Sequence, residues 1–280
     1  MKVAVTGASG FIGRHVLAEL LERPVEIVAV TRDAGHLIDF AGRVSIVCMD
    51  LGDVTEGCFH LLGRPDVLIH LAWSGLPNYK SLHHFETELP RQYRFLKTLV
   101  EGELRSLVVT GTCFEYGMQS GVLSEDLPTM PNNPYGHEKD ALRRQLEFLQ
   151  TVRSFNFTWA RLFYVYGNGQ APGALYPQLK QAVLRGDRQF NLSGGEQLRD
   201  YLPVEEIAGC LVALGLRRSN AGVVNVCSGK PVSVRTLVET WLNVNHWKIK
   251  LNFGYYPYPD YEPMAFWGDR SRLNAILRDS

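Results

Sequence analysis

Hydrophobic residues follow two different periodicities in the first half of the chain. Short runs rich in Val and Ile, such as residues 3–6, are typical of buried strands. Longer stretches carry apolar residues at every third or fourth position, as at Leu89, Tyr93, Leu96 and Val100, and this spacing predicts helices. Strands are expected at 3–6, 25–31, 44–49, 67–71, 107–110 and 157–162, and helices at 11–23, 83–101 and 135–152. Because strands and helices alternate, we predict the α/β fold class, with a Rossmann-like, doubly wound parallel sheet.

The alternation of strands and helices ends after residue 162. Glycine and proline then mark loops near 167–173 and 193–195, and helical patterns return near 175–185, 204–216 and 234–245. The last forty residues (241–280) are dense in aromatic residues and proline. They are too irregular for a strand of a sheet and too apolar for a disordered tail. We expect a larger domain formed by 1–162 with parts of about 201–227, and a smaller C-terminal lobe formed by about 163–200 and 228–280.

Composition and charge exclude several classes of protein. The 280 residues are 45% hydrophobic, and the 29 Lys+Arg balance the 29 Asp+Glu, which argues against a general nucleic-acid binder. The sequence shows neither an apolar run of membrane-spanning length nor a signal peptide, so no membrane partner is expected. The five cysteines are widely spaced, without a C-x-x-C pair, and indicate reduced thiols in a cytoplasmic protein. No metal site is expected.

A glycine-rich turn joins the first expected strand to the first expected helix. The spacing G-x-x-G-x-x-G leaves backbone N–H groups open to a phosphate at the N-terminus of a helix, where the dipole favours anions. The third glycine also lets the helix lie close to the strand. Because the turn lies between a strand and a helix, it predicts a dinucleotide site. The candidate cofactor-binding residues here are Gly7, Ser9, Gly10, Phe11, Ile12 and Gly13.

The end of the second strand bears on which dinucleotide is bound. An acidic residue there favours NAD, whereas an arginine pairs with the 2′-phosphate of NADP. Arg32 stands at the expected position, but Asp33 follows it directly, so a shift of one residue reverses the assignment. We favour NADP(H), with NAD(H) as the alternative. Asp50, which closes the third strand, is a candidate contact to adenine.

A tyrosine followed by a lysine four residues later suits carbonyl chemistry beside a nicotinamide. The lysine lies on the same helix face as the tyrosine and lowers the pKa of its phenol. The spacing occurs three times in this chain, at Tyr93/Lys97, Tyr135/Lys139 and Tyr176/Lys180. Only Tyr135 and Lys139 open the helix that follows the fifth strand, near the strand ends where open α/β sheets bind ligands. They are therefore the candidate catalytic pair.

A hydroxyl group at the end of the fifth strand completes the candidate catalytic set. Thr112 would lie near Tyr135 and could hydrogen-bond a substrate carbonyl. Thr110 competes with it, but Thr110 lies nearer the strand interior, where a structural role is expected.

Taken together, these motifs resemble those of the extended short-chain dehydrogenase/reductases, which act on nucleotide-linked sugars, over nearly all 280 residues. The resemblance implies Thr112, Tyr135 and Lys139 as catalytic hydroxyl, acid/base and lysine. It also implies Arg199 as a contact to the substrate diphosphate; from the residues alone, Arg199 would be expected to pair with Asp200. The motifs are Thr6–Gly13, Asp50-Leu51, Ile69-His70-Leu71-Ala72, Thr110-Gly111-Thr112 with Tyr116-Gly117, Tyr135–Lys139, Arg161-Leu162 and Arg199–Val204.

The resemblance extends the cofactor site to Leu51, Leu71 and Ala72. It also implies a homodimer, formed through the helices at about 84–101 and 135–152, because apolar positions remain on these helices after one face covers the sheet. The expected partners are thus a nucleotide-sugar substrate and a second copy of the chain.

Three departures from the family pattern affect the substrate site. Trp73 replaces the second alanine after the fourth strand, so an indole is expected to border the substrate. The asparagine usual in the helix before the fifth strand is not evident in 85–91, and the one usual after the Arg161 strand is replaced within 163–166. The candidate substrate-binding residues are Trp73, Thr112, Tyr164 and Arg199.

Several reactions share this scaffold. A 4,6-dehydratase has an Asp-Glu pair after the threonine, whereas Cys113-Phe114 follow Thr112 and Glu115 is the only nearby carboxylate. A dehydratase is therefore not favoured. Because Arg32 favours NADP(H), which a reductase consumes once per turnover, we favour NAD(P)H-dependent reduction of the 4-keto group of a nucleotide-linked 4-keto-6-deoxyhexose. A weaker resemblance in the late aromatic segment suggests deoxysugar nucleotides for bacterial surface polysaccharide (O-antigen). The alternatives are an NAD-dependent nucleotide-sugar 4-epimerase and a non-catalytic nucleotide-binding scaffold.

Overall fold

The computed structural model describes residues 1–278, and its centre is one parallel sheet of seven strands in the order β12-β7-β5-β4-β1-β2-β3. This arrangement confirms the predicted α/β fold class. All six expected strands are present, and β12 is a seventh that the hydrophobic pattern did not reveal. The strands are β1 (Lys2–Thr6), β2 (Glu26–Thr31), β3 (Ser45–Cys48), β4 (Val67–His70), β5 (Ser106–Thr112), β7 (Asn156–Leu162) and β12 (Gly222–Val226).

The strand sequences explain why the sheet is buried on both faces. Strand β1 pairs with β2 and β4 in parallel, with Val3 opposite Ile27 and Val67. Val3 and Val5 belong to the apolar core on one face, while Ala4 between them belongs to the core on the other face. Consecutive side chains of a strand point to opposite faces, so a continuous apolar run is needed where both faces are covered.

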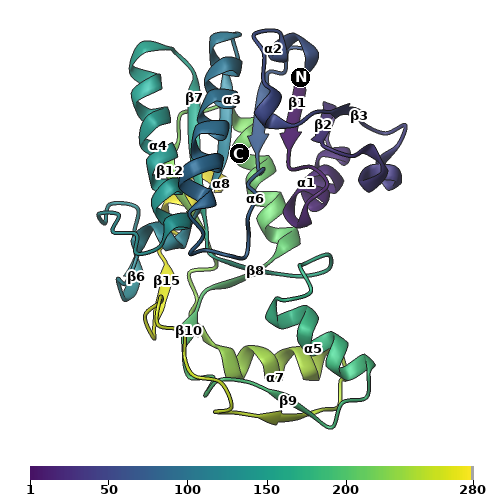
Figure 1. Cartoon of the computed structure of the whole chain (residues 1–280), viewed down its shortest axis with the longest axis vertical. Coiled ribbons are helices and arrows are strands. Elements are labelled where there is room, and N and C mark those ends of the chain that lie inside the picture. The colour runs from purple at the N-terminus through teal and green to yellow at the C-terminus, as the bar shows by residue number, and fades with distance from the viewer. Residues whose placement is uncertain (279–280) are drawn as a thin grey trace.

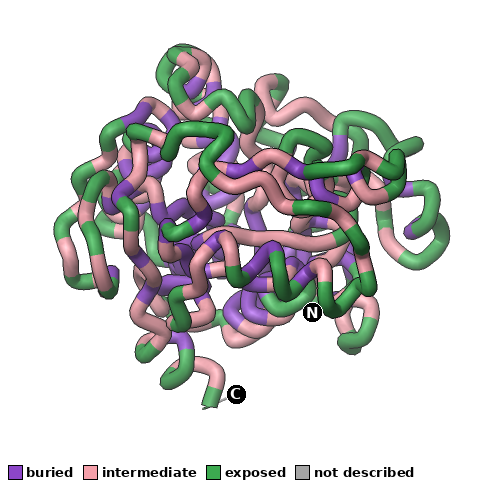
Figure 2. Tube along the Cα trace, turned by 90° about the horizontal axis from the view of Figure 1, so that it is seen from below, coloured by how far each residue is buried: buried purple, intermediate pink, exposed green. Residues whose placement is uncertain are grey.

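Two pairs of helices cover the two faces. Helices α1 (Phe11–Leu21) and α6 (Val204–Arg217) pack with the Val3 side of the sheet, and α3 (Leu89–Glu101) and α4 (Pro134–Val152) pack with the Ala4 side, beside the short α2 (Cys58–Leu61). Figure 1 shows α3 and α4 next to each other on their face. Figure 2 shows the buried residues gathered inside the fold and the exposed ones on its outer turns. No helix within residues 1–278 combines the length and apolarity needed to cross a membrane.

A smaller lobe has an apolar core of its own. It contains α5 (Leu175–Leu184), α7 (Val234–Val244) and the strand pairs β9 (Gln189–Asn191) with β14 (Lys250–Asn252) and β10 (Leu198–Arg199) with β13 (Val232–Ser233). Its core joins Leu179, Phe190, Val238 and Trp241. Figure 1 shows this lobe below the large sheet, reached from it through β8 (Tyr164–Tyr166). Strand β8 pairs in parallel with β11 (Tyr201–Pro203).

The C-terminal segment differs from its expectation. The density of aromatic residues and proline in 241–280 predicts no strand, but β14 lies in this segment, and so does β15 (Phe266–Gly268), which pairs with β6 (Gly121–Leu123). Both strands are only three residues long and are set by their distant partners. Helix α8 (Ser271–Arg278) packs on β12 and α6, and Leu273 joins the core of the large sheet. We propose the division into two domains as before, with α8 assigned to the sheet domain.

Short helical turns complete the edge of the sheet where the strands end. They are η1 (Ala34–Phe40), η2 (Leu51–Asp53) and η4 (Cys113–Tyr116), all 3₁₀, and η3 (His84–Glu88), which is a π-helical turn. The expected helix at 83–101 therefore begins with a π turn before α3. Turns of this kind occur frequently at functional sites.

Candidate active site

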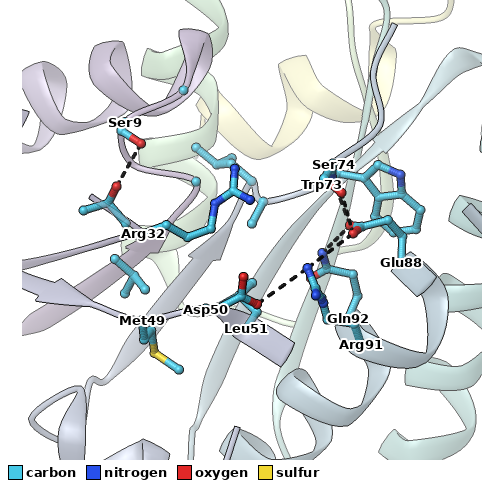
Figure 3. A pocket seen from close by; sticks show the side chains of 16 residues that line it. Ser9, Arg32, Met49, Asp50, Leu51, Trp73, Ser74, Glu88, Arg91 and Gln92 are labelled. Atoms are coloured by element: carbon cyan, nitrogen blue, oxygen red, sulfur yellow. Dashed lines mark hydrogen bonds and ion pairs between the residues drawn. The ribbon is translucent and has the colours of Figure 1, made fainter. Parts of the chain in front are cut away.

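A cavity of about 240 Å³ lies at the carboxyl ends of the first three strands and β4. Figure 3 shows Arg32 extending into it from one wall and Glu88, Arg91 and Gln92 from the opposite wall. Ligands bind at this edge of open α/β sheets. Of the predicted cofactor-binding residues, those that line this cavity are Gly7, Ser9, Gly10, Arg32, Asp50, Leu51, Leu71 and Ala72.

The glycine turn is required by packing as well as by access. Gly7 has a φ of +66°, which favours glycine, and a Cβ there would lie 2.9 Å from the backbone nitrogen of Ala72. A Cβ on Gly13 would lie 2.1 Å from the carbonyl oxygen of Gly7, so only glycine lets α1 lie this close to the turn. Gly10 is the N-cap of α1 and has no side chain to occupy the first N–H groups of the helix. The turn therefore fits an anionic group at the helix N-terminus.

Arg32 and Asp33 lie in different environments. Arg32 lines the cavity, and within residues 1–278 its guanidinium has no hydrogen bond or ion pair. Asp33 is not among the lining residues, because it is the N-cap of η1 and its Oδ1 accepts from Gly35 N at 2.8 Å. The hydroxyl of Thr31 lies between Ser9 Oγ, at 3.0 Å, and the carbonyl oxygen of Asp33, at 3.1 Å. The geometry thus turns the arginine toward the cavity and the carboxylate away from it.

Asp50 closes the opposite side of the same cavity. Its Oδ1 accepts from Gly52 N at 2.7 Å and lies 3.5 Å from Arg91 Nη1. Arg91, from α3, also lines the cavity and is a residue that the sequence analysis missed. The spacing along the chain gave no signal for it, because α3 approaches η2 only in the folded structure.

A second and larger cavity, of about 1030 Å³, continues from the first. The two share Gly7, Gly10, Leu71 and Trp73 in their walls, so they form one cleft over the glycine turn. Among the residues that line the larger cavity within 1–278, Lys80 is the only charged one. The predicted residues Phe11, Ile12 and Gly13 line it, together with Leu76, Pro77, Asn78, Tyr79, Lys80, Asn133, Gln170, Ala171, Pro172, Gly173, Ala174 and Tyr261.

Tyr135 lies beside this larger cavity, at the start of α4. Its ring packs against Trp73, with centroids 6.0 Å apart, and against Tyr79, at 5.5 Å, and both of these residues line the cavity. The pKa of the Tyr135 phenol is not lowered, as the lysine four residues later led us to expect, because burial raises it well above its usual value. The hydrogen bond with the Thr112 side chain acts in the opposite direction. The phenol is therefore protonated at neutral pH, as a proton donor must be.

Lys139 is fully buried one turn after Tyr135. Its Nζ donates to the carbonyl oxygen of Thr110 at 2.9 Å and lies 4.1 Å from the centre of the Trp73 indole ring. It is 6.0 Å from the centre of the Tyr135 ring. Burial lowers the pKa of Lys139 to about 7, although the carboxylates of Glu115 and Glu88 raise it. The structure thus brings the predicted lysine to the predicted tyrosine.

Thr112 and Thr110 have the different positions expected of them. Thr112 is the N-cap of η4, where its Oγ1 accepts from Phe114 N at 3.3 Å. That bond uses a lone pair and leaves the hydroxyl proton available. Thr110 instead donates its hydroxyl to the carbonyl oxygen of His70 at 3.3 Å, inside the sheet. Thr112 is therefore the hydroxyl that belongs with Tyr135.

Glu115, the only carboxylate expected near Thr112, is fully occupied. It accepts from Thr112 N at 2.8 Å and from Trp159 Nε1 at 3.0 Å, and its Oε2 lies 2.8 Å from Arg161 Nε. The Glu115 and Arg161 side chains are 0% and 2% exposed. A buried ion pair of this kind needs all its hydrogen bonds to offset the loss of hydration. Glu115 therefore holds the end of β5 in place and is not directed toward the cleft.

Arg199 does not have the partner that the residues alone led us to expect. It does not pair with Asp200, whose carboxylate accepts backbone N–H groups of Ser228 and Gly229. Its Nε donates to Glu262 Oε2 at 3.1 Å, in a pair whose side chains are 4% and 9% exposed. The predicted substrate residue Tyr164 donates its hydroxyl to the same carboxylate. Glu262 was not predicted, because its segment is remote in sequence from both partners.

The other two tyrosine–lysine pairs lie outside the cleft. Lys97 lies 3.8 Å from Glu101 on α3, and Lys180 lies 3.5 Å from Asn168. Tyr176 packs on Trp241 in the core of the smaller lobe. Within residues 1–278, no group of three or more His, Cys, Asp or Glu is arranged to hold a metal ion.

Comparisons with known proteins show what the chain is similar to. Residues 3–227 match the model of the family described as "NAD dependent epimerase/dehydratase family". The chain is 29% identical to a dTDP-6-deoxy-L-talose 4-dehydrogenase (NAD(+)) from Aggregatibacter actinomycetemcomitans, over 96% of this chain and 99% of the relative. It is 26% identical to a UDP-glucose 4-epimerase from Halalkalibacterium halodurans, over 85% and 79%. The solved structure of MoeE5 in complex with UDP-glucuronic acid and NAD has a TM-score of 0.84 at 27% identity, covering 99% and 93%.

Proposed function

Since the chain belongs to the NAD dependent epimerase/dehydratase family of nucleotide-sugar enzymes, we propose that it reduces the 4-keto group of a nucleotide-linked 4-keto-6-deoxyhexose. One observation carries this proposal. Thr112, Tyr135 and Lys139 come together beside a largely uncharged cavity, next to a glycine turn that fits a dinucleotide. Proton donation to a carbonyl oxygen at that point completes a reduction.

The chain's own groups have separate tasks in the proposed reaction. A bound nicotinamide cofactor supplies the hydride that reaches the C4 carbon of the sugar. Tyr135 gives its phenolic proton to the oxygen on that carbon, and Thr112 donates a hydrogen bond to the same oxygen. Lys139, as a cation, stabilises the phenolate that remains on Tyr135. The Thr110 carbonyl holds the lysine in place.

The state of Glu115 favours reduction over dehydration. Elimination of water from the sugar needs an additional acid and base near the reacting carbons. Glu115 is buried and is bonded to Thr112 N, Trp159 and Arg161. It is therefore not available to move a proton to or from a sugar.

The character of the larger cavity supports a deoxysugar. Its aromatic lining residues include Trp73, Tyr79 and Tyr261, and among the described residues its one charged side chain, Lys80, lies 3.7 Å from Asp260. A methyl group at C6 fits aromatic surroundings, since burying it there recovers roughly 0.8 kcal/mol per carbon. The 29%-identical relative is named for a 6-deoxyhexose 4-dehydrogenase activity, which is the reverse of a 4-keto reduction.

The preference for NADPH rests on Arg32. The guanidinium is directed into the cofactor cavity while the Asp33 carboxylate caps η1. A 2′-phosphate at this place would gain a charge-assisted hydrogen bond and would meet no carboxylate from Asp33. The relative's printed name specifies NAD(+), so NADH is the alternative cofactor.

We assign the substrate diphosphate to Arg199, as the resemblance implies. Arg199 faces Glu262 in the structure, so the diphosphate would compete with this carboxylate for the guanidinium. The Tyr164 hydroxyl donates to the same Glu262 carboxylate. If the diphosphate displaced this carboxylate from Arg199, the Tyr164 hydroxyl would also be freed.

The chain is also proposed to form a homodimer through α3 and α4. Phe148 and Val152, on successive turns of α4, are 73% and 67% exposed, which is unusual for large apolar side chains on a helix that already covers a sheet. A cytoplasmic location and a role in making deoxysugar nucleotides for surface polysaccharide complete the proposal. The free thiols of the five cysteines fit a reducing compartment.

A second candidate is a nucleotide-sugar 4-epimerase, which the 26%-identical relative favours. An epimerase oxidises and then reduces the same carbon and keeps its NAD bound, whereas a reductase consumes one cofactor molecule per turnover. The test is a panel of nucleotide-linked 4-keto-6-deoxyhexoses, incubated with NADPH or NADH and followed at the nicotinamide absorbance. Stoichiometric oxidation with at least one sugar supports the reductase. Interconversion of two nucleotide sugars without added cofactor would replace it by the epimerase.

A further inference from the structure

A buried carboxylate holds the segment that follows β4. Glu88, at the end of the η3 π turn, is 1% exposed. Its Oε2 accepts from Ser74 N at 2.9 Å, and its Oε1 accepts from the Ser74 hydroxyl at 2.7 Å. Gln92 Nε2 donates to Oε2 at 2.8 Å. Both oxygens of one carboxylate are therefore used, and two of the three bonds reach a single residue of the cleft wall.

The neighbouring indole is held by the same π turn. Trp73 Nε1 lies 3.1 Å from His84 Nδ1, and because an indole nitrogen only donates, His84 must accept there. The proton of this imidazole is then on Nε2, which donates to the carbonyl oxygen of Asn78 at 2.9 Å. The π turn places His84 and Glu88 four residues apart with both side chains buried. One turn thus holds Trp73 by its ring and Ser74 by its backbone and hydroxyl.

The held indole covers the catalytic lysine. Its ring centre lies 4.1 Å from Lys139 Nζ, within the range in which an ammonium group is attracted by an aromatic face. Nζ also donates to the carbonyl oxygen of Thr110, which belongs to β5. Trp73 and Thr110 thus both hold the ammonium group, and a shift of the 73–74 segment would remove one of these two contacts.

On this basis, and resting on the proposed function, we propose that Glu88 is a positioning residue of the active site. Glu88 holds Ser74 while His84 holds the indole of Trp73. Together they fix Trp73 against Lys139 and so set the position of the Lys139 ammonium group near Tyr135. Glu88 also lines the smaller cavity, but the role proposed here depends only on its hydrogen bonds to Ser74. It acts through the 73–74 segment.

The charged and titratable groups around Lys139 make the role measurable. Glu115 from η4, Glu88 from η3, His70 from β4 and Tyr135 from its own helix face the ammonium group. Glu88 and Glu115 both raise the pKa of Lys139, against the larger effect of burial. Removing the Glu88 charge lowers that pKa further. Since the proposed reaction needs cationic Lys139, turnover of such a variant should begin to fall at a lower pH than turnover of the wild type.

The test uses the ligand-free protein labelled with ¹³C at lysine Cε, so it does not depend on the substrate. Protons above an aromatic ring resonate at unusually high field, and the Lys139 signal is identified by its loss in Lys139→Ala. Glu88→Gln keeps the length of the side chain but gives one Ser74 or Gln92 donor an amide instead of an oxygen. We expect the Lys139 signal to move toward the ordinary lysine position in Glu88→Gln, and to reach that position in Trp73→Leu. Glu86→Gln, an exposed carboxylate on the same turn, should leave it unchanged.

Ser74→Ala keeps the hydrogen bond from Ser74 N to Glu88 but removes the hydroxyl contacts with Glu88 and with His83 Nε2. It should move the Lys139 signal less, in the same direction, and it serves as the test if Glu88→Gln does not fold. In the reductase assay, Glu88→Gln should lower kcat by about tenfold or more, since misplacement of a reacting group by about 1 Å costs of order a hundredfold. A Lys139 signal that stays in place in both variants overturns the positioning role, whatever the sugar panel shows. If the Lys139 signal moves as expected in Glu88→Gln but the wild-type protein reduces no 4-keto sugar, the proposed function is overturned and the positioning role is left intact.

Discussion

The two places where a nucleotide sugar is proposed to meet this chain differ in how their charged groups are partnered. At the catalytic end, Lys139 donates to a backbone carbonyl and lies against an indole, without an ion pair within residues 1–278. At the diphosphate end, Arg199 already pairs with the carboxylate of Glu262, and Tyr164 donates to the same group. The first site is arranged before a ligand arrives, whereas the second must exchange one anion for another.

This difference has an energetic consequence. Groups that are placed before binding contribute mainly to the transition state, so their loss should appear in kcat. An arginine that must leave a carboxylate to reach a diphosphate gains only the difference between two charge-assisted bonds, so changes there should appear mainly in KM. The following variants test whether the two ends divide in this way.

The largest effect is expected for Tyr135→Phe. The variant keeps the ring and its contacts with Trp73 and Tyr79 but loses the proton donor. We expect kcat to fall by ~10²–10⁴, the usual contribution of acid–base assistance, with cofactor binding and thermal unfolding close to those of the wild type. Steady-state assays and calorimetry measure both.

Tyr93→Phe is the matched control, since Tyr93 and Lys97 have the same spacing on α3. Its kcat should stay within a few-fold of the wild-type value. If Tyr93→Phe abolished turnover and Tyr135→Phe did not, the catalytic end would be wrongly placed.

Arg32→Ala extends the comparison to a third cation, which differs from Arg199 because it has no ion pair within the described residues. Because the Arg32 guanidinium gives up no other ion pair, its full interaction energy with a 2′-phosphate contributes to binding. Wild-type protein should prefer NADPH over NADH by at least about tenfold in kcat/KM, which corresponds to ~1.4 kcal/mol. Arg32→Ala should remove this preference by weakening NADPH alone, as measured by steady-state kinetics with both cofactors.

Arg43→Ala, at an exposed arginine just before β3, provides the control and should leave the preference intact. A wild-type preference for NADH would instead show that Asp33 or another acidic group governs the ribose.

Glu262→Gln tests the diphosphate end and should act in the opposite direction to most mutations. Without the competing charge, Arg199 is more available, so the KM of the nucleotide sugar should fall by about three- to tenfold, or up to ~1.4 kcal/mol. The glutamine retains an acceptor for the buried guanidinium, which limits the loss of stability that an unpaired charge would cause. Asp260→Asn, the exposed control in the same segment, removes a carboxylate that does not contact Arg199 and should leave the KM close to the wild-type value.

An unchanged KM in Glu262→Gln would mean that Arg199 does not exchange partners and that the diphosphate binds elsewhere. A large fall in kcat at constant KM would place Glu262 at the catalytic end.

The smallest effect on chemistry is expected for Phe148→Glu, on the α4 face proposed for the dimer. A charge at this exposed apolar position should dissociate the dimer in sedimentation at micromolar concentration and leave kcat within a few-fold. Leu184→Glu, equally apolar and 68% exposed but on α5, should keep the wild-type mass. A monomeric wild-type protein would contradict the proposed interface.

The sequence predicted the sheet well because its signals are local. Continuous apolar runs mark β1, β2, β4, β5 and β7, and the glycine turn marks both the start of α1 and the cofactor end of the cleft. The choice of Tyr135 among three equally spaced pairs also followed from its place after β5. In each case, short-range periodicity and the topology of parallel sheets are sufficient.

The parts that were missed depend on contacts between distant segments. Strand β12 contains three valines, but it is only five residues long and follows the point where the alternation of strands and helices ends; its pairing with β7 defines it. Glu262 meets Arg199 across 63 residues of chain, and Glu88 meets Ser74 through a π turn that helical periodicity cannot distinguish from an ordinary turn of α-helix. The sequence shows that Trp73 replaces an alanine of the family pattern, but only the contact of Trp73 with Lys139 in the structure indicates what this replacement does.

Transfer of deuterium tests the central claim most directly. The purified protein is incubated with a nucleotide-linked 4-keto-6-deoxyhexose and NADPH, or NADH if that is preferred, deuterated at the transferable position of the nicotinamide. The account predicts one deuterium at C4 of the product, one cofactor oxidised for each sugar reduced, and no transfer by Tyr135→Phe. A product that forms without deuterium at C4, or that forms equally well with Tyr135→Phe, would contradict it.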